Sequence, residues 1–460
     1  MSGVDRSRLP EVGPDPAFTF PEIVRHTLPN GLQVRTVEHT SIPLITIVLQ
    51  VEGGSGADTA DKEGLAAIVA DMVDEGTGAL SAIDVSDAMA RIGGDYDVDV
   101  SPDVTVFSLT TLTRFAARGA SLLSDMTTRP SMRETDFVRV RQLRLDRLKQ
   151  LKDLPPAVAE RAFLRLMYAQ HPYGHVPIGS DDALRRISLD DASALHAASF
   201  RPSRATLVIT GALPHQELLA VANGAFGEWT NDGRVSHPEV QRASAIEPSE
   251  VAPPRLAIVA REGAAQSELR IGHLSARRNT PDYPPLLVMN ALLGGQFVSR
   301  INLKLREEKA YTYGARTGFD WRRGLSPFVL QASVHTASTA NAIADAIGEI
   351  EGLRGSRPPT AEELVLAKTS LTRGYPRNFE TAQQVARSIA QLALYDLPDT
   401  YFAEFVPKVN AVGEDDVTRV AERYLAPEKM TTLIVGDHSA IADSLSTLGL
   451  GTPSVLPPEL

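Results

Sequence analysis

The fold of this chain is decided by a stretch that occurs twice, as DDASALHAASFRPSRATLVITG at residues 190–211 and as DDVTRVAERYLAPEKMTTLIVG at residues 415–436. Asp190 and Asp415 open the two copies, Gly211 and Gly436 close them, and both pairs are 225 residues apart. Each copy is typical of a helix, a proline-marked turn and a short β-branched strand that ends at glycine. The chain is therefore predicted to be a duplicated α+β unit.

Similar segments also precede the two copies. Pro130 is followed by a helical pattern over residues 135–151, and Pro359 by one over residues 361–373. A length of 460 residues suits about three average domains or two large ones. We expect an N-terminal domain at residues 1–229 and a C-terminal domain at residues 255–460. Residues 230–254 are polar, contain an Asn-Asp-Gly turn and two adjacent prolines, and are predicted to be the linker.

The composition excludes several classes of function. Lys and Arg number 46 against 57 Asp and Glu, a net charge of -11, which argues against nucleic acid as a partner. The absence of cysteine excludes disulfide frameworks, cysteine-ligated zinc and cysteine nucleophiles. No apolar run approaches the about 18 residues of a membrane span, and the first ten residues lack a signal-peptide core. A cytoplasmic location is favoured, and a periplasmic one stays open if a signal has been trimmed.

The sequence contains few recognisable catalytic, cofactor-binding or metal-binding motifs. The chain has no phosphate-binding Gly-x-x-x-x-Gly-Lys loop, no dinucleotide fingerprint and no Gly-x-Ser-x-Gly nucleophile elbow. His171 and His175 are close in sequence, but Pro172 and Gly174 between them oppose a helical turn. We therefore expect a structural loop that orders the helix beginning near Asp181 rather than a metal-binding pair.

A family resemblance rests on several motifs taken together. They are LPNGLQV at 28–34, GLAAIVADM at 64–72 with EGT at 75–77, HPYG at 171–174, LGGQFVSR at 293–300, LRE at 305–307 and YTY at 311–313. In combination the chain resembles the M16 family of pitrilysin, insulinase and mitochondrial processing peptidase. The resemblance covers nearly the whole chain. It implies an α+β fold of two homologous halves, each a mixed or antiparallel sheet packed with helices, that together form half of a clamshell.

The resemblance also implies that this chain has lost its zinc site. Active members carry His-x-x-Glu-His, whose histidines bind zinc and whose glutamate activates water, and Ala67, Ala70 and Asp71 stand at these positions. The third ligand, a glutamate, would fall near Asp146 or Arg147. Zinc needs three protein ligands and an open water position, so we expect no metal in this chain and zinc in a catalytic partner.

The second half keeps residues that can stabilise charge. Arg306 and Tyr313 have the spacing of the family's Arg/Tyr pair, which the resemblance places across the clamshell, against the substrate carbonyl and the developing oxyanion of a zinc site. A guanidinium and a phenol are both suited to that task. Tyr311 is a competing choice for the tyrosine. The simpler alternative is that Arg306 is a solvated residue and Tyr313 an ordinary strand residue.

Two further features of the sequence can each be interpreted in two ways. Gly294 and Gly295 are either a helix C-cap or a flexible loop that meets the substrate, as in the non-catalytic partners of the family. The strand over residues 107–110 could accept an extended peptide at a sheet edge, although an ordinary core strand is favoured.

The leading hypothesis is a non-catalytic subunit of a heterodimeric, bacterial-type M16 zinc endopeptidase, inactive on its own. Its partners would be a catalytic M16 subunit with an intact His-x-x-Glu-His motif and an unfolded peptide substrate. The chain could also form a homodimer when alone. The alternative is a peptide-binding or scaffold homologue with no part in proteolysis, and a third possibility is a stand-alone enzyme with a different site.

Overall fold

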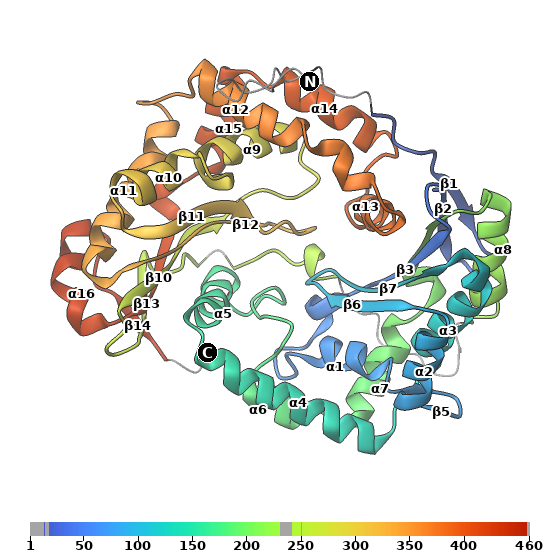
Figure 1. Ribbon diagram of the computed structural model, residues 1–460. Helices are drawn as coiled ribbons and strands as arrows, with labels where there is room; N and C mark the ends of the chain where they lie inside the picture. Colours follow the sequence, from blue (N-terminus) through green and yellow to red (C-terminus); the bar gives the residue numbers. More distant parts are fainter. Residues whose placement is uncertain (1–12, 14–17, 231–241, 250, 458–460) are drawn as a thin grey trace, which may run out of the picture.

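The computed structural model describes residues 13, 18–230, 242–249 and 251–457. The chain forms two six-stranded sheets, and each sheet takes its strands from one side of the predicted linker (Figure 1). Part of that linker, residues 231–241 and 250, lies outside the described residues. The domain boundaries at 229 and 255 therefore stay predictions.

The N-terminal sheet is mixed. Its strands lie in the order β1 (Val24–Thr27), β2 (Gln33–Glu38), β8 (Ala205–Gly211), β3 (Leu44–Glu52), β7 (Val104–Leu112) and β6 (Asp95–Val100). Only β2 and β8 run parallel, and the other neighbours are antiparallel. The strand over residues 107–110 belongs to β7, which pairs with β3 and β6 on its two sides, so it is a core strand and the edge belongs to β6.

The C-terminal sheet repeats this arrangement. Its order is β14 (Ser454–Leu456), β9 (Leu256–Ala260), β13 (Thr431–Gly436), β10 (Gln266–Leu274), β12 (Pro327–His335) and β11 (Thr312–Phe319). The parallel pair β9 and β13 corresponds to β2 and β8, and the edge strand β11 corresponds to β6. Five strands of each half thus share one topology, as the repeat predicts, and the sixth differs: β14 pairs parallel with β9, whereas β1 pairs antiparallel with β2.

The repeated stretch has the same structure in both halves. Helices α7 (Leu189–Ser199) and α15 (Glu414–Tyr424) are each followed by a 3₁₀ turn and then by β8 or β13. Asp191 and Asp416 each sit in the first turn of their helix and accept a hydrogen bond from the backbone N–H of the N-cap residue. This contact explains the acidic start of both copies, since a carboxylate satisfies a free donor at a helix N-terminus. The cap is reciprocal only in α7, where the Ser188 hydroxyl accepts the Asp191 N–H.

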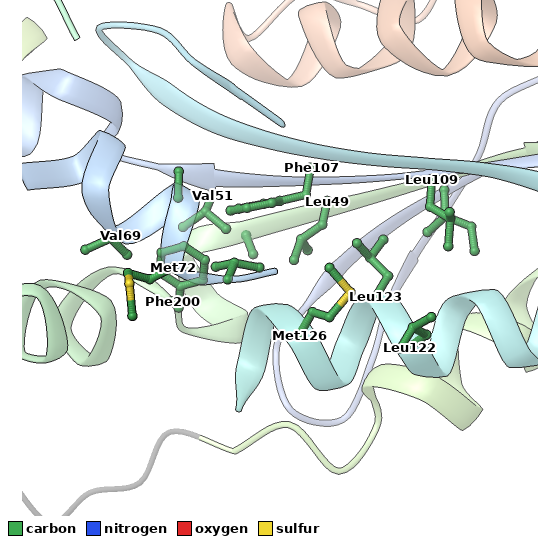
Figure 2. Close-up of a cluster of buried hydrophobic side chains, with 14 of the residues drawn as sticks. Leu49, Val51, Val69, Met72, Phe107, Leu109, Leu122, Leu123, Met126 and Phe200 are labelled. Carbon is green, nitrogen blue, oxygen red and sulfur yellow. The ribbon is translucent and has the colours of Figure 1, made fainter. Parts of the chain in front are cut away.

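Helices cover one face of the N-terminal sheet. They are α1 (Leu65–Met72), α2 (Ala82–Arg91), α3 (Ala116–Thr128), α4 (Glu134–Lys152), α6 (Asp181–Arg186), α7 and α8 (His215–Phe226), with the small β4 (Gly76–Thr77) and β5 (Leu80–Ser81) hairpin beside α2. Figure 2 shows the core between β3, β7, α1 and α3, where Leu49, Phe107, Leu123 and Met72 are inaccessible to solvent. Burial of such side chains contributes about 1.5–3 kcal/mol each.

The C-terminal sheet is covered in the same way. Its helices are α9 (Tyr283–Asn290), α10 (Arg300–Asn302), α11 (Thr339–Leu353), α12 (Ala361–Thr372), α14 (Tyr401–Ala411), α15 and α16 (His438–Leu445). The segment Tyr283–Glu308 contains an 18-residue window apolar enough for a membrane-spanning helix, but 56% of that window is buried inside the protein. Burial of that extent is typical of a core helix of a folded domain.

The two halves exchange helices across the molecule. Helix α5 (Pro155–Tyr168) of the first half packs on β10 and β13, and α13 (Ala382–Leu394) of the second half packs on β3 and β8 (Figure 1). Phe163 on α5 and Ile389 on α13 are buried at these contacts. Each sheet is therefore covered on its second face by the other half, which leaves the inner strands β3, β8, β10 and β13 almost wholly buried.

Candidate functional site

The positions that correspond to the zinc motif lie on α1, and two of them carry no ligand. Ala67 and Ala70 are buried, with 2% and 1% exposure. Asp71 forms an ion pair with Arg144 on the neighbouring α4, where the guanidinium Nε donates to the Asp71 carboxylate over 2.7 Å. A second guanidinium nitrogen of Arg144 donates to the Ala67 backbone carbonyl over 2.9 Å. A fixed cation thus occupies the space beside this turn of α1.

The residue of α4 that faces the motif differs from the expectation. Asp146 and Arg147 are both exposed, and their side chains bond to neighbours on the same helix. Arg144, whose side chain is only 13% exposed, points to α1 instead. A sequence cannot show which face of α4 turns inward, and the assignment of the third ligand position to Asp146 or Arg147 stays a prediction.

These residues do not fit a zinc ion. Zinc binds to imidazole, thiolate or carboxylate groups, and the donors here are a single carboxylate and two methyl groups beside a permanent cation. Across residues 18–230, 242–249 and 251–457, no group of three or more His, Asp and Glu side chains is arranged to hold a metal ion. The zinc chemistry of an active M16 enzyme therefore has no site on α1 and α4.

The two histidines of the HPYG-His segment serve separate structural roles. His171 Nδ1 accepts the backbone N–H of Tyr173 over 3.0 Å, and its Nε2 lies 3.0 Å from the carbonyl of Ile246. His175 Nε2 lies 3.1 Å from Asp58, whose carboxylate also accepts the N–H groups of Gly64 and Ala66 at the start of α1. The loop thus ties α1 to the described part of the linker.

A cavity of about 800 Å³ opens next to the lost zinc position. It lies between the end of α1, the start of α2 and the start of α4, and its walls include Asp74, Glu75, Tyr96 and Arg139. Burial, with the nearby charges of Glu75 and Asp71, raises the pKa of Asp74 to about 6. Glu75 forms an ion pair with Arg139. Asp74 is therefore the carboxylate of the two whose ionised form is disfavoured.

Arg306 lies in the other half, in the π-helical turn Leu303–Glu308 that follows α10. Its guanidinium carbon is 4.3 Å from the centre of the Phe297 ring, and its Nε is 3.3 Å from the Glu307 carboxylate. The side chain is about one third exposed. Single π-helical turns are rare and are often found at functional sites.

Tyr313 lies on the neighbouring edge strand and is 87% exposed. It sits in a β-bulge of β11, where the pairing with β12 shifts between Thr312 and Ala315. A bulge leaves residues without a strand partner and redirects their side chains. Tyr311, the competing choice, packs against the core of the C-terminal half, so Tyr313 is the more available of the two phenols.

The turn that carries Arg306 packs against β11, which carries Tyr313. Both side chains are therefore on the same corner of the C-terminal half. Phe297 and Val298, at 60% and 44% exposure, extend this corner as an apolar surface. Their roles in binding or catalysis stay predictions, because the structure contains no substrate or partner chain.

Gly294 and Gly295 form the end of a second π-helical turn, Ala291–Gly295. Gly294 is buried, and a Cβ atom there would lie 2.5 Å from the Thr317 hydroxyl oxygen on β11. Neither glycine has the positive φ of a left-handed C-cap. Close packing against β11 is therefore the structural reason for glycine at 294, while a role of this turn in substrate binding stays a prediction.

Two residues near these sites were not predicted from the sequence. Arg144 bonds to Asp71 on α1, and Asn302 bonds both to the Phe297 carbonyl and to the Ala315 amide beside the Tyr313 bulge. Asn302 is a buried polar residue at the end of α10, and its burial is seen only in the structure. No spacing rule identifies its partners, since they come from a loop and from a strand bulge.

Comparison with known proteins agrees with this geometry. Residues 34–179 match the family model described as insulinase (peptidase family M16), and residues 186–371 match the model described as the peptidase M16 inactive domain. A protein named as an uncharacterized zinc protease of Mycobacterium tuberculosis is 22% identical over 90% of this chain and 93% of its own length. The mitochondrial-processing peptidase subunit beta of Lentinula edodes is 23% identical over 91% of this chain and 90% of its own.

Solved structures show the same fold. A peptidase M16 inactive domain from Pseudomonas fluorescens superposes with a TM-score of 0.83 at 21% identity, covering 90% of this chain and 98% of that one. A protease from Helicobacter pylori also has a TM-score of 0.83 at 21% identity, covering 91% of this chain and all of that one. The sequence motifs, the duplicated sheets and these matches lead to one conclusion: the chain belongs to the M16 peptidase family.

Proposed function

We propose that this chain is the non-catalytic subunit of a two-subunit zinc endopeptidase. The observation that carries the proposal is an asymmetry between the halves. In the N-terminal half, methyl groups and the Asp71–Arg144 ion pair stand where zinc ligands would be needed. In the C-terminal half, Arg306 and Tyr313 remain on an accessible corner.

The chemistry of this pair suits a site completed by another chain. A guanidinium and a phenol can both donate hydrogen bonds to a carbonyl oxygen as it gains negative charge. Neither group can polarise water as zinc does, so the pair alone is no hydrolase. The partner would be an M16 chain with an intact His-x-x-Glu-His motif, which would supply the metal and the general base. The substrate would be an unfolded peptide held between the two subunits.

The test is co-purification from the native cell followed by a peptidase assay. We expect a companion chain with the intact zinc motif, and peptide hydrolysis by the mixture well above that of either chain alone. Arg306→Ala and Tyr313→Phe should each lower kcat by about 10- to 1000-fold, the range found when an oxyanion donor is removed. A stable complex whose hydrolysis is indifferent to both substitutions would instead indicate the scaffold role.

A further inference from the structure

The two residues of the proposed site are linked through one buried side chain. Asn302 is 4% exposed and is the last residue of α10, directly before the π-helical turn that carries Arg306. Its side-chain Nδ2 donates to the Phe297 carbonyl over 2.7 Å. Its Oδ1 accepts the backbone N–H of Ala315 over 3.0 Å. One amide therefore bridges the 297 loop and the β11 bulge.

The Ala315 contact holds the bulge that presents Tyr313. Tyr313 and Gly314 together stand opposite the single residue Ser333 of β12, and Asn302 satisfies the amide of the residue that follows them. The other side of the bulge is fixed by Thr312, whose hydroxyl donates to the Ser333 carbonyl over 2.7 Å and accepts the Gly314 N–H over 3.1 Å. Removal of the Asn302 side chain would leave the Ala315 amide buried and unpaired, which favours a shift of the bulge.

The Phe297 contact supports Arg306. The ring of Phe297 lies 4.3 Å from the guanidinium carbon, a favourable cation–π distance. Because 60% of Phe297 is exposed, the surrounding core does little to fix this ring. The bond from Asn302 to the Phe297 carbonyl is the contact that anchors its backbone to α10.

We propose that Asn302 is a positioning residue that holds Arg306 and Tyr313 in a common geometry toward the substrate carbonyl; this role rests on the proposed function. Asn302 itself is buried, so it would act through Arg306 and Tyr313 and not by contact with the substrate. Its loss would misplace two donors together. A displacement of about 1 Å in the side chains that contact the reacting atoms can lower the rate a hundredfold, and the effect is mainly on kcat.

The experiment compares Asn302→Ala with Asn290→Ala as a matched control. Asn290 bonds to Thr317, farther along β11 and away from the bulge. The full chain is labelled with 3-fluorotyrosine at its ten tyrosines, and the ¹⁹F signal of Tyr313 is assigned by its disappearance in Tyr313→Phe. Both variants are then measured free by ¹⁹F NMR and in complex with the co-purified zinc-bearing partner by peptide hydrolysis.

We expect Asn302→Ala to shift the Tyr313 signal and to lower kcat by about tenfold or more with KM changed by less than about threefold. The control should do neither. An unmoved Tyr313 signal or an unchanged kcat in Asn302→Ala would overturn the role. If Asn302→Ala fails to fold, Asn302→Asp replaces it, because aspartate keeps an acceptor for the Ala315 N–H and loses the amide donor to the Phe297 carbonyl. Asn302→Asp should leave the Tyr313 signal in place while kcat still falls. An unchanged kcat in this variant would overturn the role.

Failure of the proposed function would be seen separately. If Arg306→Ala and Tyr313→Phe leave hydrolysis unchanged, the non-catalytic-subunit proposal is wrong and the catalytic part of the role of Asn302 is wrong with it. The ¹⁹F NMR measurement still decides whether Asn302 holds Tyr313 in position. If those two substitutions lower kcat and Asn302→Ala does not, the proposed function stands and only the inference about Asn302 is overturned.

Discussion

The Nε atom of Arg144 donates a hydrogen bond to the carboxylate of Asp71 over 2.7 Å, and this ion pair joins α4 to the helix that carries a zinc motif in active M16 enzymes. The same guanidinium caps the Ala67 carbonyl. A charge pair and a backbone contact thus hold α4 against α1.

Asp71→Ala should destabilise the fold. It leaves the mostly buried Arg144 guanidinium without its carboxylate, and removing one partner of such a pair costs more than the pair contributes. Because Asp71 is 38% exposed, solvent reduces the effect, and we expect a loss of about 1–2 kcal/mol in urea unfolding. Asp146→Ala on the exposed face of α4 is the control and should change stability by less than about 0.5 kcal/mol. Equal effects of the two substitutions would contradict the role of the pair.

Restoring the motif alone should not restore tight zinc binding. The triple variant Ala67→His, Ala70→Glu and Asp71→His provides two imidazoles, but Arg144 keeps a positive charge beside them. Adding Arg144→Glu supplies a third ligand from the residue that faces α1, and we expect zinc affinity to rise at least about tenfold over the triple variant. Zinc titration of both proteins measures this difference. Comparable affinities would show that Arg144 does not occupy the ligand position.

Asp74→Asn should stabilise the chain at neutral pH and not in acid. The pKa of Asp74 is raised to about 6 in the folded state, above the about 4 of an unfolded chain, so the folded form binds the proton more tightly. Stability from this group is present below pH 4 and is lost as the pH rises through 6. After allowance for partial exposure, we expect a gain of about 1 kcal/mol at pH 7.5 that disappears near pH 4. Thermal unfolding at both pH values is the measurement, and a pH-independent difference would refute it.

Ala310→Gly should make the chain slightly more stable. Ala310 follows the Arg306 turn with φ of +52°, a left-handed conformation that disfavours a side chain. Glycine removes this strain but loses more backbone entropy on folding, so the expected net gain is about 0.5 kcal/mol. Ala90→Gly on the exposed face of α2 is the contrast and should lose about 0.5–1 kcal/mol. A loss of the same size at both positions would show that the turn is unstrained.

The architecture was largely predictable because the chain is duplicated. The 225-residue offset predicted two equal units, and α7 and α15 with their acidic caps lie where the two copies place them. The exchange of α5 and α13 between the halves was not predictable, since the period of a helix reveals its apolar face but not which sheet that face will cover.

The site was predictable only where it depends on residue type. Ala67 and Ala70 cannot bind zinc in any fold, so the absence of ligands at these two positions follows from the sequence. Arg144 could not be identified, because the choice among neighbouring residues of α4 depends on helix packing. Asn302 was missed for a related reason: its two partners are backbone groups, and backbone groups carry no mark in a sequence.

The most direct test of the central claim is peptide hydrolysis by the complex of this chain with its zinc-bearing companion, comparing wild type with Arg306→Ala. The account predicts that kcat falls by about 10- to 1000-fold while the complex still assembles and keeps its zinc. Arg316→Ala, which removes an exposed arginine paired with Gln331 on the same sheet, is the matched control and should retain wild-type turnover. Wild-type kcat in the Arg306→Ala complex, or full activity of the companion in the absence of this chain, would contradict the claim.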